Sequence, residues 1–166
     1  MLPPWAQVSP ERRAHIERVA GLVGGWAHSM GIAEPERARW LKAAYLHDAL
    51  RDASPRLANE LAHGPAAAER AANEGETDQG VLDAVRYHTV GYAEWDDVGR
   101  MLYLADFLEP GRNFAADARR AFAARVPQER DAVLKDVVRW RIEWVMRSGW
   151  PLAPETIGLW NALASR

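Results

Sequence analysis

The chain has 166 residues, the size of one ordinary domain, and 48% of them are hydrophobic while 27% are charged. This composition is typical of a globular protein with a buried core and excludes a disordered or fibrous chain. Its 21 basic and 23 acidic residues leave a net charge of −2, so no general attraction for nucleic acid or a membrane surface is expected. The absence of cysteine excludes disulfides, thiolate metal sites and cysteine nucleophiles.

The sequence also lacks obvious signals for export or membrane insertion. No apolar run approaches the ~20 residues that span a bilayer, and the first residues show neither the charged region nor the apolar region of a secretory signal. We therefore expect a cytoplasmic protein of the bacterial type that binds neither membranes nor nucleic acid. The oligomeric state is left open, with a homodimer as one option.

Hydrophobic side chains recur at steps of three and four residues along almost the whole chain, which is the pattern of helices with one buried face. Ser9 is suited to cap the first helix, Pro10 to occupy its first turn, and Gly31 to end it in the left-handed conformation. No segment alternates with a period of two, so no sheet is expected. The pattern predicts helices over, in order, residues 10–30, 35–48, 54–61, 66–75, 81–88, 98–108, 115–124, 128–145 and 155–163.

Proline divides the second half of this pattern. Pro127 is expected to separate the helix over 115–124 from the longer helix after it, because proline ends or kinks a helix. We place Val133, Trp144 and Val145 on the buried stripe of that longer helix. Since no internal repeat and no long linker divides the chain, the sequence predicts one all-α domain.

The chain contains five histidines, and most of them lie where a core would favour aliphatic side chains. His28 has no acidic neighbour and lies off the apolar stripe of its helix, so we place it on the surface. His47 and Asp48, in contrast, end the apolar segment 43–46. Burying an unpaired imidazole and carboxylate is costly, and a divalent cation would satisfy both, because both are its usual ligands.

Further polar groups occupy apolar helical faces. Asp106 follows the apolar segment 102–105, His88 shares the inward face of its helix, and His15 lies beside an apolar residue near the start of the first helix. Each of these could be a satisfied polar group of the core, and Asp106 could be a buried cap or ion-pair partner. Taken together with His47 and Asp48, they are explained more economically by a shared metal centre.

Other catalytic motifs are missing. The glycine-rich segment 21–25 has neither the lysine of a P-loop nor the spacing of a dinucleotide-binding fingerprint. There is no His-Glu-x-x-His and no Gly-x-Ser-x-Gly. The eight tryptophans suit core filling and some stacking surface, but they lack the basic residues that a nucleic-acid site would need.

The order of these residues resembles a known family. A first-helix histidine, a His-Asp pair, two further histidines and a late aspartate follow the order of the HD-domain metallophosphohydrolase superfamily. The segments that resemble the YqeK-type bacterial HD proteins are 44–52, 61–65, 84–91, 102–112 and the tail 151–157. The resemblance covers roughly residues 10–163 and implies a single HD-domain helical bundle over residues 1–166.

This resemblance implies an enzyme that hydrolyses diadenosine tetraphosphate symmetrically to two ADP, using hydroxide bound by a dinuclear metal centre. It implies two divalent metal ions, with iron expected and manganese, cobalt, nickel or zinc as alternatives. The implied ligands of one ion are His15, His47, Asp48 and Asp106. Those of the other ion are Asp48, His63 and His88, with Asp48 shared between the two.

Candidate catalytic and substrate-binding residues lie close to these ligands. The catalytic candidates are Asp48, Arg51 and Asp52; those for substrate binding are Arg51, Thr89, Gly91, Arg112 and Asn113. Arg86 is a weaker phosphate candidate, Glu109 and Asp52 could orient water or histidine N–H groups, and Tyr87, Tyr92 and Trp95 are candidates for base stacking. Each of these side chains could instead be a cap, an ion-pair partner or part of the core. Arg51 departs from the lysine usual in the family.

Three alternatives remain open at this point. An HD-type di-iron oxygenase would use the same ligand set, and an HD-type phosphatase would act on another nucleotide. A helical module that binds nucleotides without catalysis would be expected to lack a ligand. Arg51 and Arg112 favour an enzyme that acts on phosphate, because one guanidinium group can donate two parallel hydrogen bonds to phosphate oxygens.

Overall fold

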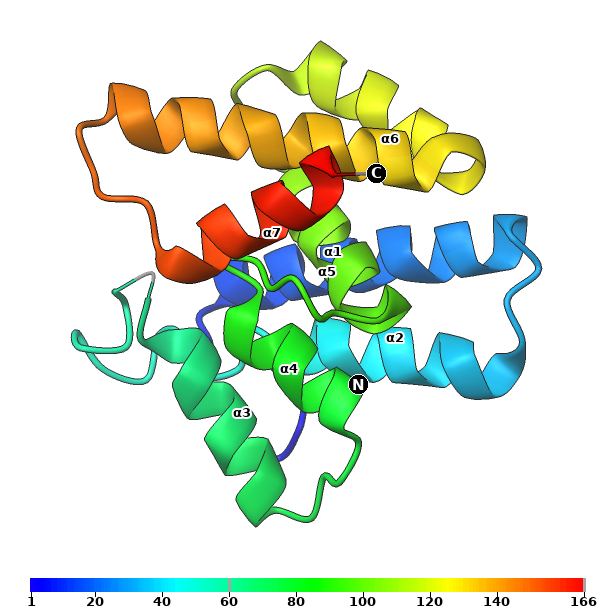
Figure 1. The fold of residues 1–166 in the computed structure, drawn as a ribbon. Coiled ribbons are helices and arrows are strands. Elements are labelled where there is room, and N and C mark those ends of the chain that lie inside the picture. Colours follow the sequence, from blue (N-terminus) through cyan, green and yellow to red (C-terminus); the bar gives the residue numbers. More distant parts are fainter. Residues whose placement is uncertain (60, 166) are drawn as a thin grey trace.

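A computed structural model describes residues 1–59 and 61–165, and within them the secondary structure is α-helical, with no strand. The all-α prediction is therefore confirmed (Figure 1). No helix of this described part has the length and apolarity needed to cross a membrane. In chain order the helices are α1 (Pro10–Ser29), α2 (Glu34–Leu46), α3 (His63–Asn73), α4 (Gln79–Tyr87), α5 (Asp97–Leu108), α6 (Ala116–Arg147) and α7 (Pro154–Ala164).

The predicted ends of α1 are confirmed. The Ser9 hydroxyl accepts a hydrogen bond from the Arg12 amide at 3.1 Å, and Pro10 occupies the first turn. Gly31 follows the helix with φ +63°, the left-handed conformation that glycine adopts at low cost. His28, near this end, is exposed as expected. These caps fix where α1 begins and therefore which of its residues face the core.

The predicted helix over 54–61 is wrong. The described residues of this stretch form turns, in which the Ser54 carbonyl accepts from the amides of Leu57 and Ala58. Leu61 is 62% exposed, so the two leucines do not form a buried face that would stabilise so short a helix. The next helix begins earlier than predicted, at His63, because a proline at position 65 is tolerated in the first turn, where amides lack helical partners.

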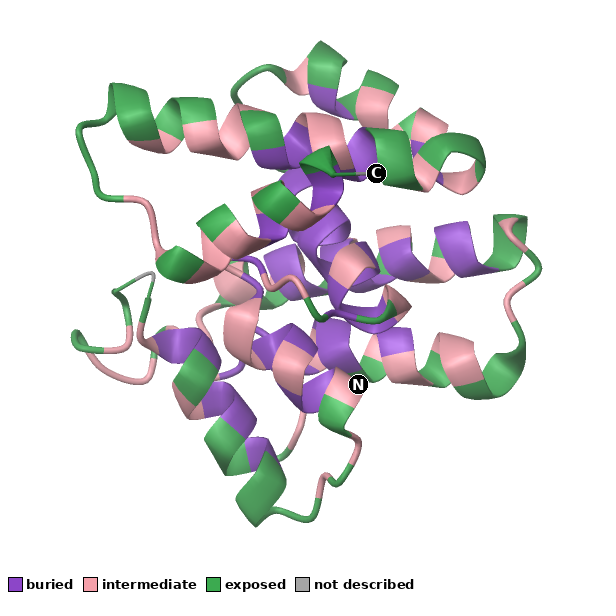
Figure 2. Cartoon of the chain, in the orientation of Figure 1, coloured by how far each residue is buried: buried purple, intermediate pink, exposed green. Residues whose placement is uncertain are grey.

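Helix α6 bends sharply where two helices were predicted. Glu129 has φ −133° and ψ 33°, which is not helical, and Pro127 lies just before it. Val133 is fully buried beyond the bend, but Trp144 is 42% exposed and Val145 is half-buried. The placement of Trp144 on the buried stripe was therefore wrong, because the last turns of α6 project past the helices on which its middle packs (Figure 2).

Helix α5 forms the centre of the bundle. It packs against α1, α2, α4 and α6, and every residue from 101 to 108 is buried (Figure 2). A helix that is apolar on all sides is typical of such a central position. Asp106 is the acidic residue within this buried stretch. The fold therefore places this carboxylate in the interior, where it needs a partner.

Gly91, which follows α4 in the chain, packs closely against α7. Its φ is +87°, and a Cβ atom added there would lie 2.6 Å from Cδ2 of Leu159, a buried residue of α7. Both the backbone conformation and the packing therefore require glycine.

We predict that Gly91→Ala lowers the free energy of unfolding by about 2–4 kcal/mol, since strain at φ and overpacking add. Denaturant unfolding measures this loss. Gly75→Ala is the matched control, because Gly75 has φ +98° but no atom within 4 Å of an added Cβ. Its loss should be about 1 kcal/mol. Equal losses in the two variants would show that contact with Leu159 is unimportant.

Candidate metal centre

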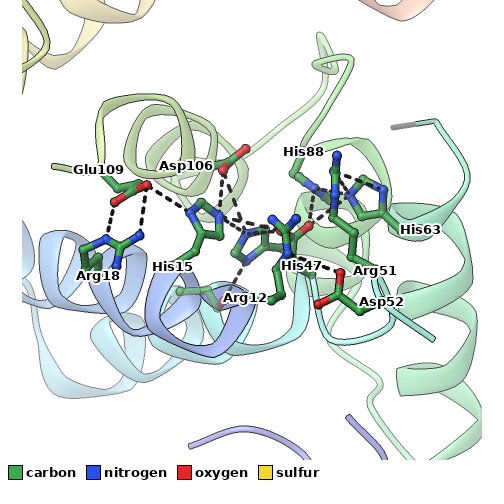
Figure 3. Close-up of polar contacts among 12 residues, drawn as sticks. Arg12, His15, Arg18, His47, Arg51, Asp52, His63, His88, Asp106 and Glu109 are labelled. Atoms are coloured by element: carbon green, nitrogen blue, oxygen red, sulfur yellow. Dashed lines mark hydrogen bonds and ion pairs between the residues drawn. The ribbon is translucent and has the colours of Figure 1, made fainter. Parts of the chain in front are cut away.

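The six side chains predicted as metal ligands converge in the interior (Figure 3). They come from widely separated parts of the chain. His15 is on α1, His47 and Asp48 directly follow α2, His63 begins α3, His88 directly follows α4, and Asp106 is on α5. All six are buried. Because most of them lie at helix ends, the helix boundaries determine the geometry of the cluster.

One part of the cluster surrounds Oδ2 of Asp48. The Nε2 atoms of His15 and His47 each lie 3.7 Å from this oxygen and 3.4 Å from each other. Asp106 Oδ1 lies 3.1 Å from His15 Nε2 and 4.0 Å from His47 Nε2. His15, His47 and Asp48 thus offer ligand atoms close enough together to hold a metal ion.

The other part surrounds Oδ1 of the same carboxylate. His63 Nε2 lies 3.0 Å from this oxygen and His88 Nε2 lies 3.5 Å from it, while the two ring nitrogens are 3.0 Å apart. Asp48, His63 and His88 form a second group that could hold a metal ion. The two oxygens of Asp48 therefore face two separate pairs of histidines.

The opposite nitrogen of each histidine lies beside an oxygen. These Nδ1 contacts are His47 to the Ala44 carbonyl at 2.7 Å, His63 to the Asn59 carbonyl at 3.1 Å, His88 to the Val85 carbonyl at 2.8 Å and His15 to Glu109 Oε1 at 3.2 Å. An oxygen of this kind accepts a hydrogen bond, so Nδ1 carries the proton. The Nε2 lone pairs are thereby aimed into the cluster, as in metal-binding histidines.

The donor atoms of the cluster fit a divalent cation. Asp48 Oδ1 is buried and has no hydrogen-bond partner, which is costly unless a cation compensates it. The nitrogens that face each other within each pair would repel unless a proton or a metal ion lay between them. Imidazole nitrogen and carboxylate oxygen are ligands that transition-metal ions accept.

Protonation of the cluster follows from burial and neighbouring charge. Burial lowers the pKa of His47 to about 4, which keeps this ring neutral. Burial also acts on His15, but hydrogen bonds to Asp106 and Glu109 outweigh it and raise the pKa of His15 to about 9. Burial would raise the pKa of Asp48, yet the histidines around it, His47 first, hold it well below its usual range. A cation bound beside His15 would therefore displace a proton.

Arg12 neutralises part of the charge on Asp48, and sequence analysis missed it. Its Nη1 atom lies 2.6 Å from Asp48 Oδ2. Asp52 lies behind Arg12, with its Oδ1 atom 3.8 Å from Arg12 Nε, and its Oδ2 atom accepts from the Ser9 amide at 2.9 Å. Asp52 thus links the start of α1 to the segment after α2. The spacing of Arg12 and His15, one helical turn apart, is the signal that could have identified this arginine.

Glu109 supports His15 from the far side. Besides its contact with His15, it accepts from Arg18 Nε at 2.6 Å and from the Gly111 amide at 2.7 Å. Burial opposes ionisation, but the hydrogen bonds from His15 and Arg18 outweigh it and lower the pKa of Glu109 to about 2. This carboxylate therefore orients a histidine N–H, which is one of the roles considered for it.

The structure brings Arg51 and Arg112 to the cluster. Arg51 Nη1 lies 3.4 Å from Nδ1 and 3.2 Å from Nε2 of His63. Arg112 donates to the Asp106 carbonyl at 3.1 Å and to Asp106 Oδ1 at 2.9 Å. Burial favours the neutral form of Asp106, but Arg112 and the histidines outweigh it and hold its pKa well below the usual range.

The remaining substrate candidates are placed less directly. Thr89 is half-buried, and its carbonyl accepts from Arg141 at 3.0 Å. Gly91 is buried against α7, and Asn113 is exposed. Within residues 1–59 and 61–165, the structure gives no contact of Thr89, Gly91 or Asn113 with the cluster.

The aromatic candidates for base stacking have partners of their own. Trp95 is buried and donates to the Asp83 carbonyl at 3.1 Å, so it is a core residue. Tyr87 and Tyr92 stack on each other with ring centres 4.4 Å apart. Trp144, which sequence analysis assigned to the core, is more accessible than any of these.

Two curated relatives are similar to this chain over somewhat less than two thirds of its length. A protein from Halalkalibacterium halodurans is 29% identical over 106 residues, which cover 63% of this chain and 56% of that protein. A Bacillus subtilis protein is 32% identical over 108 residues, covering 64% of this chain and 56% of its own. Both are named symmetrical bis(5'-nucleosyl)-tetraphosphatases. The alignments thus span little more than half the length of these relatives.

The fold extends over more of the chain than these alignments. A solved structure from Clostridium acetobutylicum, described as a predicted HD superfamily hydrolase involved in NAD metabolism, superposes with a TM-score of 0.83 at 22% identity. The superposition covers 96% of this chain and 92% of that one. The HD domain model matches residues 12–111, a segment that contains all six side chains of the cluster. The chain therefore belongs to the HD domain family.

Proposed function

We propose that this protein is a metal-dependent phosphohydrolase that cleaves diadenosine tetraphosphate symmetrically into two ADP. The observation that carries this proposal is the position of Asp48, whose two oxygens each face a separate pair of buried histidines. The names of the curated relatives support the substrate class. Arginine side chains beside the cluster support a substrate that carries phosphate.

The proposed centre would hold two divalent metal ions, and Asp48 would be a ligand of both. One ion would be bound by His15, His47, Asp48 and Asp106. The other would be bound by Asp48, His63 and His88. Iron is the metal that family resemblance favours, and manganese, cobalt, nickel and zinc accept the same ligands. Arg12, which contacts Asp48, would limit the excess negative charge that the two carboxylates bring to the interior.

When bound, such a pair of ions lowers the pKa of water and offsets charge on phosphoryl oxygens. In symmetrical cleavage, water adds to one of the two inner phosphorus atoms, and the bond from that atom to the central bridging oxygen breaks. ADP leaves with that oxygen, and the attacked half becomes the second ADP. The residues of the chain must therefore orient the inner phosphates and hold the ligands rigidly.

We assign these tasks to the side chains around the cluster. Arg51, which lies over His63, would bind an inner phosphate, and Arg112 would do so while holding Asp106. Asp52 would act as a positioning residue, because it fixes Arg12 and the start of α1. Thr89, Gly91 and Asn113 stay candidates for substrate contact by their proximity in sequence to His88 and Arg112.

A product assay tests the proposed function. The metal-loaded protein should convert diadenosine tetraphosphate to ADP alone and contain two metal ions per chain, measured by chromatography and elemental analysis. Asp48→Ala should lose both ions and the activity, because this carboxylate is shared. AMP plus ATP as products, oxygen uptake without ADP release, or unchanged turnover in Asp48→Ala would each contradict the proposal.

Replacing Glu109 tests the support of His15. Glu109→Ala should weaken metal binding by about 10–100-fold, the usual effect of removing a hydrogen-bond partner of a metal-binding histidine. Competition with a chelator measures the affinity. His28→Ala, at an exposed histidine, is the control and should be silent. An unchanged affinity in Glu109→Ala would show that His15 binds metal without the support of this carboxylate.

Replacing Arg51 separates phosphate binding from metal binding. Arg51→Met should raise KM for diadenosine tetraphosphate by about ten- to a hundredfold, the value of lost hydrogen bonds to a charged group. Its metal content should match the unmodified protein. Arg56→Met, at an exposed arginine of the same segment, should leave both quantities unchanged. Loss of metal in Arg51→Met would assign this arginine to the centre rather than to the substrate.

A further inference from the structure

A groove of about 770 Å³ lies beside the His63–His88 side of the metal centre. Its walls are the end of α4, the last turns of α6 and the segment that leads into α7 (Figure 1). The lining side chains that matter for its chemistry are Arg86, Tyr87, Arg141, Trp144, Trp150 and Glu155. This volume lies within the range of small-molecule sites, which are largely apolar with a few polar groups.

Two tryptophans make the groove unusual for a protein surface. Trp144 is 42% exposed and Trp150 is 53% exposed, and their rings meet edge to face with centres 5.2 Å apart. Large aromatic side chains are normally buried, so a pair left accessible in a groove indicates a binding surface. A planar aromatic ring is the ligand that such side chains bind best, because they offer faces for stacking.

The same groove carries positive charge. Arg86 lies in the lining, and its guanidinium makes no hydrogen bond or ion pair with residues 1–59 or 61–165. Arg141 is held in place by its bond to the Thr89 carbonyl and lies against the Tyr103 ring, 5.6 Å from its centre. Guanidinium groups beside an aromatic surface suit a ligand that joins a base to phosphate.

The groove is bordered by residues next to the metal centre. Tyr87 and Thr89, which flank His88 in the chain, are part of its lining. Asn59 lines it too, and the carbonyl of Asn59 accepts the Nδ1 proton of His63. A ligand that filled the groove would therefore lie against residues that flank His88 in the chain or contact His63.

We propose that this groove binds one nucleoside end of the dinucleotide, with its base against Trp144 and Trp150 and its phosphates directed past Arg86 to the centre. Glu155 offers an acceptor for the ribose hydroxyls. The proposal rests on the proposed function, because it assigns a place to the adenosine of that substrate. It makes these tryptophans determinants of specificity for a base.

Calorimetric titration of the metal-loaded protein with ADP and with pyrophosphate tests the assignment, since only ADP has a base. Trp144→Ala and Trp150→Ala should each raise Kd for ADP by about tenfold and leave Kd for pyrophosphate unchanged, as expected for lost base stacking. Arg86→Gln should weaken both ligands. Met146→Ala is the matched control, because Met146 is 64% exposed on the same helix and does not line the groove.

An unchanged Kd for ADP in both tryptophan variants would overturn the proposal, and so would equal weakening of ADP and pyrophosphate. The rival occupant of the groove is a second copy of the chain, and sedimentation velocity detects it. If the tryptophan variants change from dimer to monomer while their affinity for ADP stays the same, the proposal is overturned. If ADP binding depends on Trp144 but diadenosine tetraphosphate is not cleaved, the proposed function fails and the nucleoside site stands. If it is cleaved with unchanged KM in both tryptophan variants, the nucleoside site fails and the function stands.

Discussion

The structure depends on one buried carboxylate that is shared between two pairs of imidazoles. One oxygen of Asp48 faces His15 and His47, and the other faces His63 and His88. Burial keeps His47 neutral, and Arg12 contacts Oδ2, which leaves Oδ1 buried without a hydrogen-bond partner. The interior is therefore built around a deficit of positive charge, which a divalent cation is suited to supply.

The ends of the helices position the histidines around Asp48. His47 and His88 directly follow α2 and α4, and His63 begins α3, so each ring is fixed by a nearby backbone oxygen as well as by packing. Helix α5 contributes Asp106 from the most deeply buried part of the bundle. No two neighbouring elements could form this centre alone. A cation bound by it would stabilise the fold as a whole, because binding energy is gained only in the folded state.

Most of the helices and five of the six cluster residues could be predicted from the pattern of the sequence, because polar residues on apolar helical faces are conspicuous. His47 with Asp48 is such a case, whereas His63 was expected only from the family resemblance. The segment 54–61 could not be predicted, since short helices depend on tertiary packing that a local pattern does not reveal. Arg12 was missed because an exposed face of α1 gave no reason to single out one arginine. Trp144 was misplaced because helical periodicity indicates which side chains share a face, but not where the rest of the bundle stops.

The HD domain match ends at residue 111, whereas Trp144 and Trp150 lie well after it. The proposed nucleoside groove therefore takes its tryptophans from beyond the segment that carries the six candidate metal ligands, whereas Arg86 and Tyr87 of its lining lie within that segment. The sharp bend at Glu129 folds the later stretch back over the earlier one, so the two meet at a single opening. Substitutions at Trp144 or Trp150 would then alter the proposed nucleoside groove and leave all six candidate metal ligands unchanged. Related chains with the same centre need not share a preferred substrate.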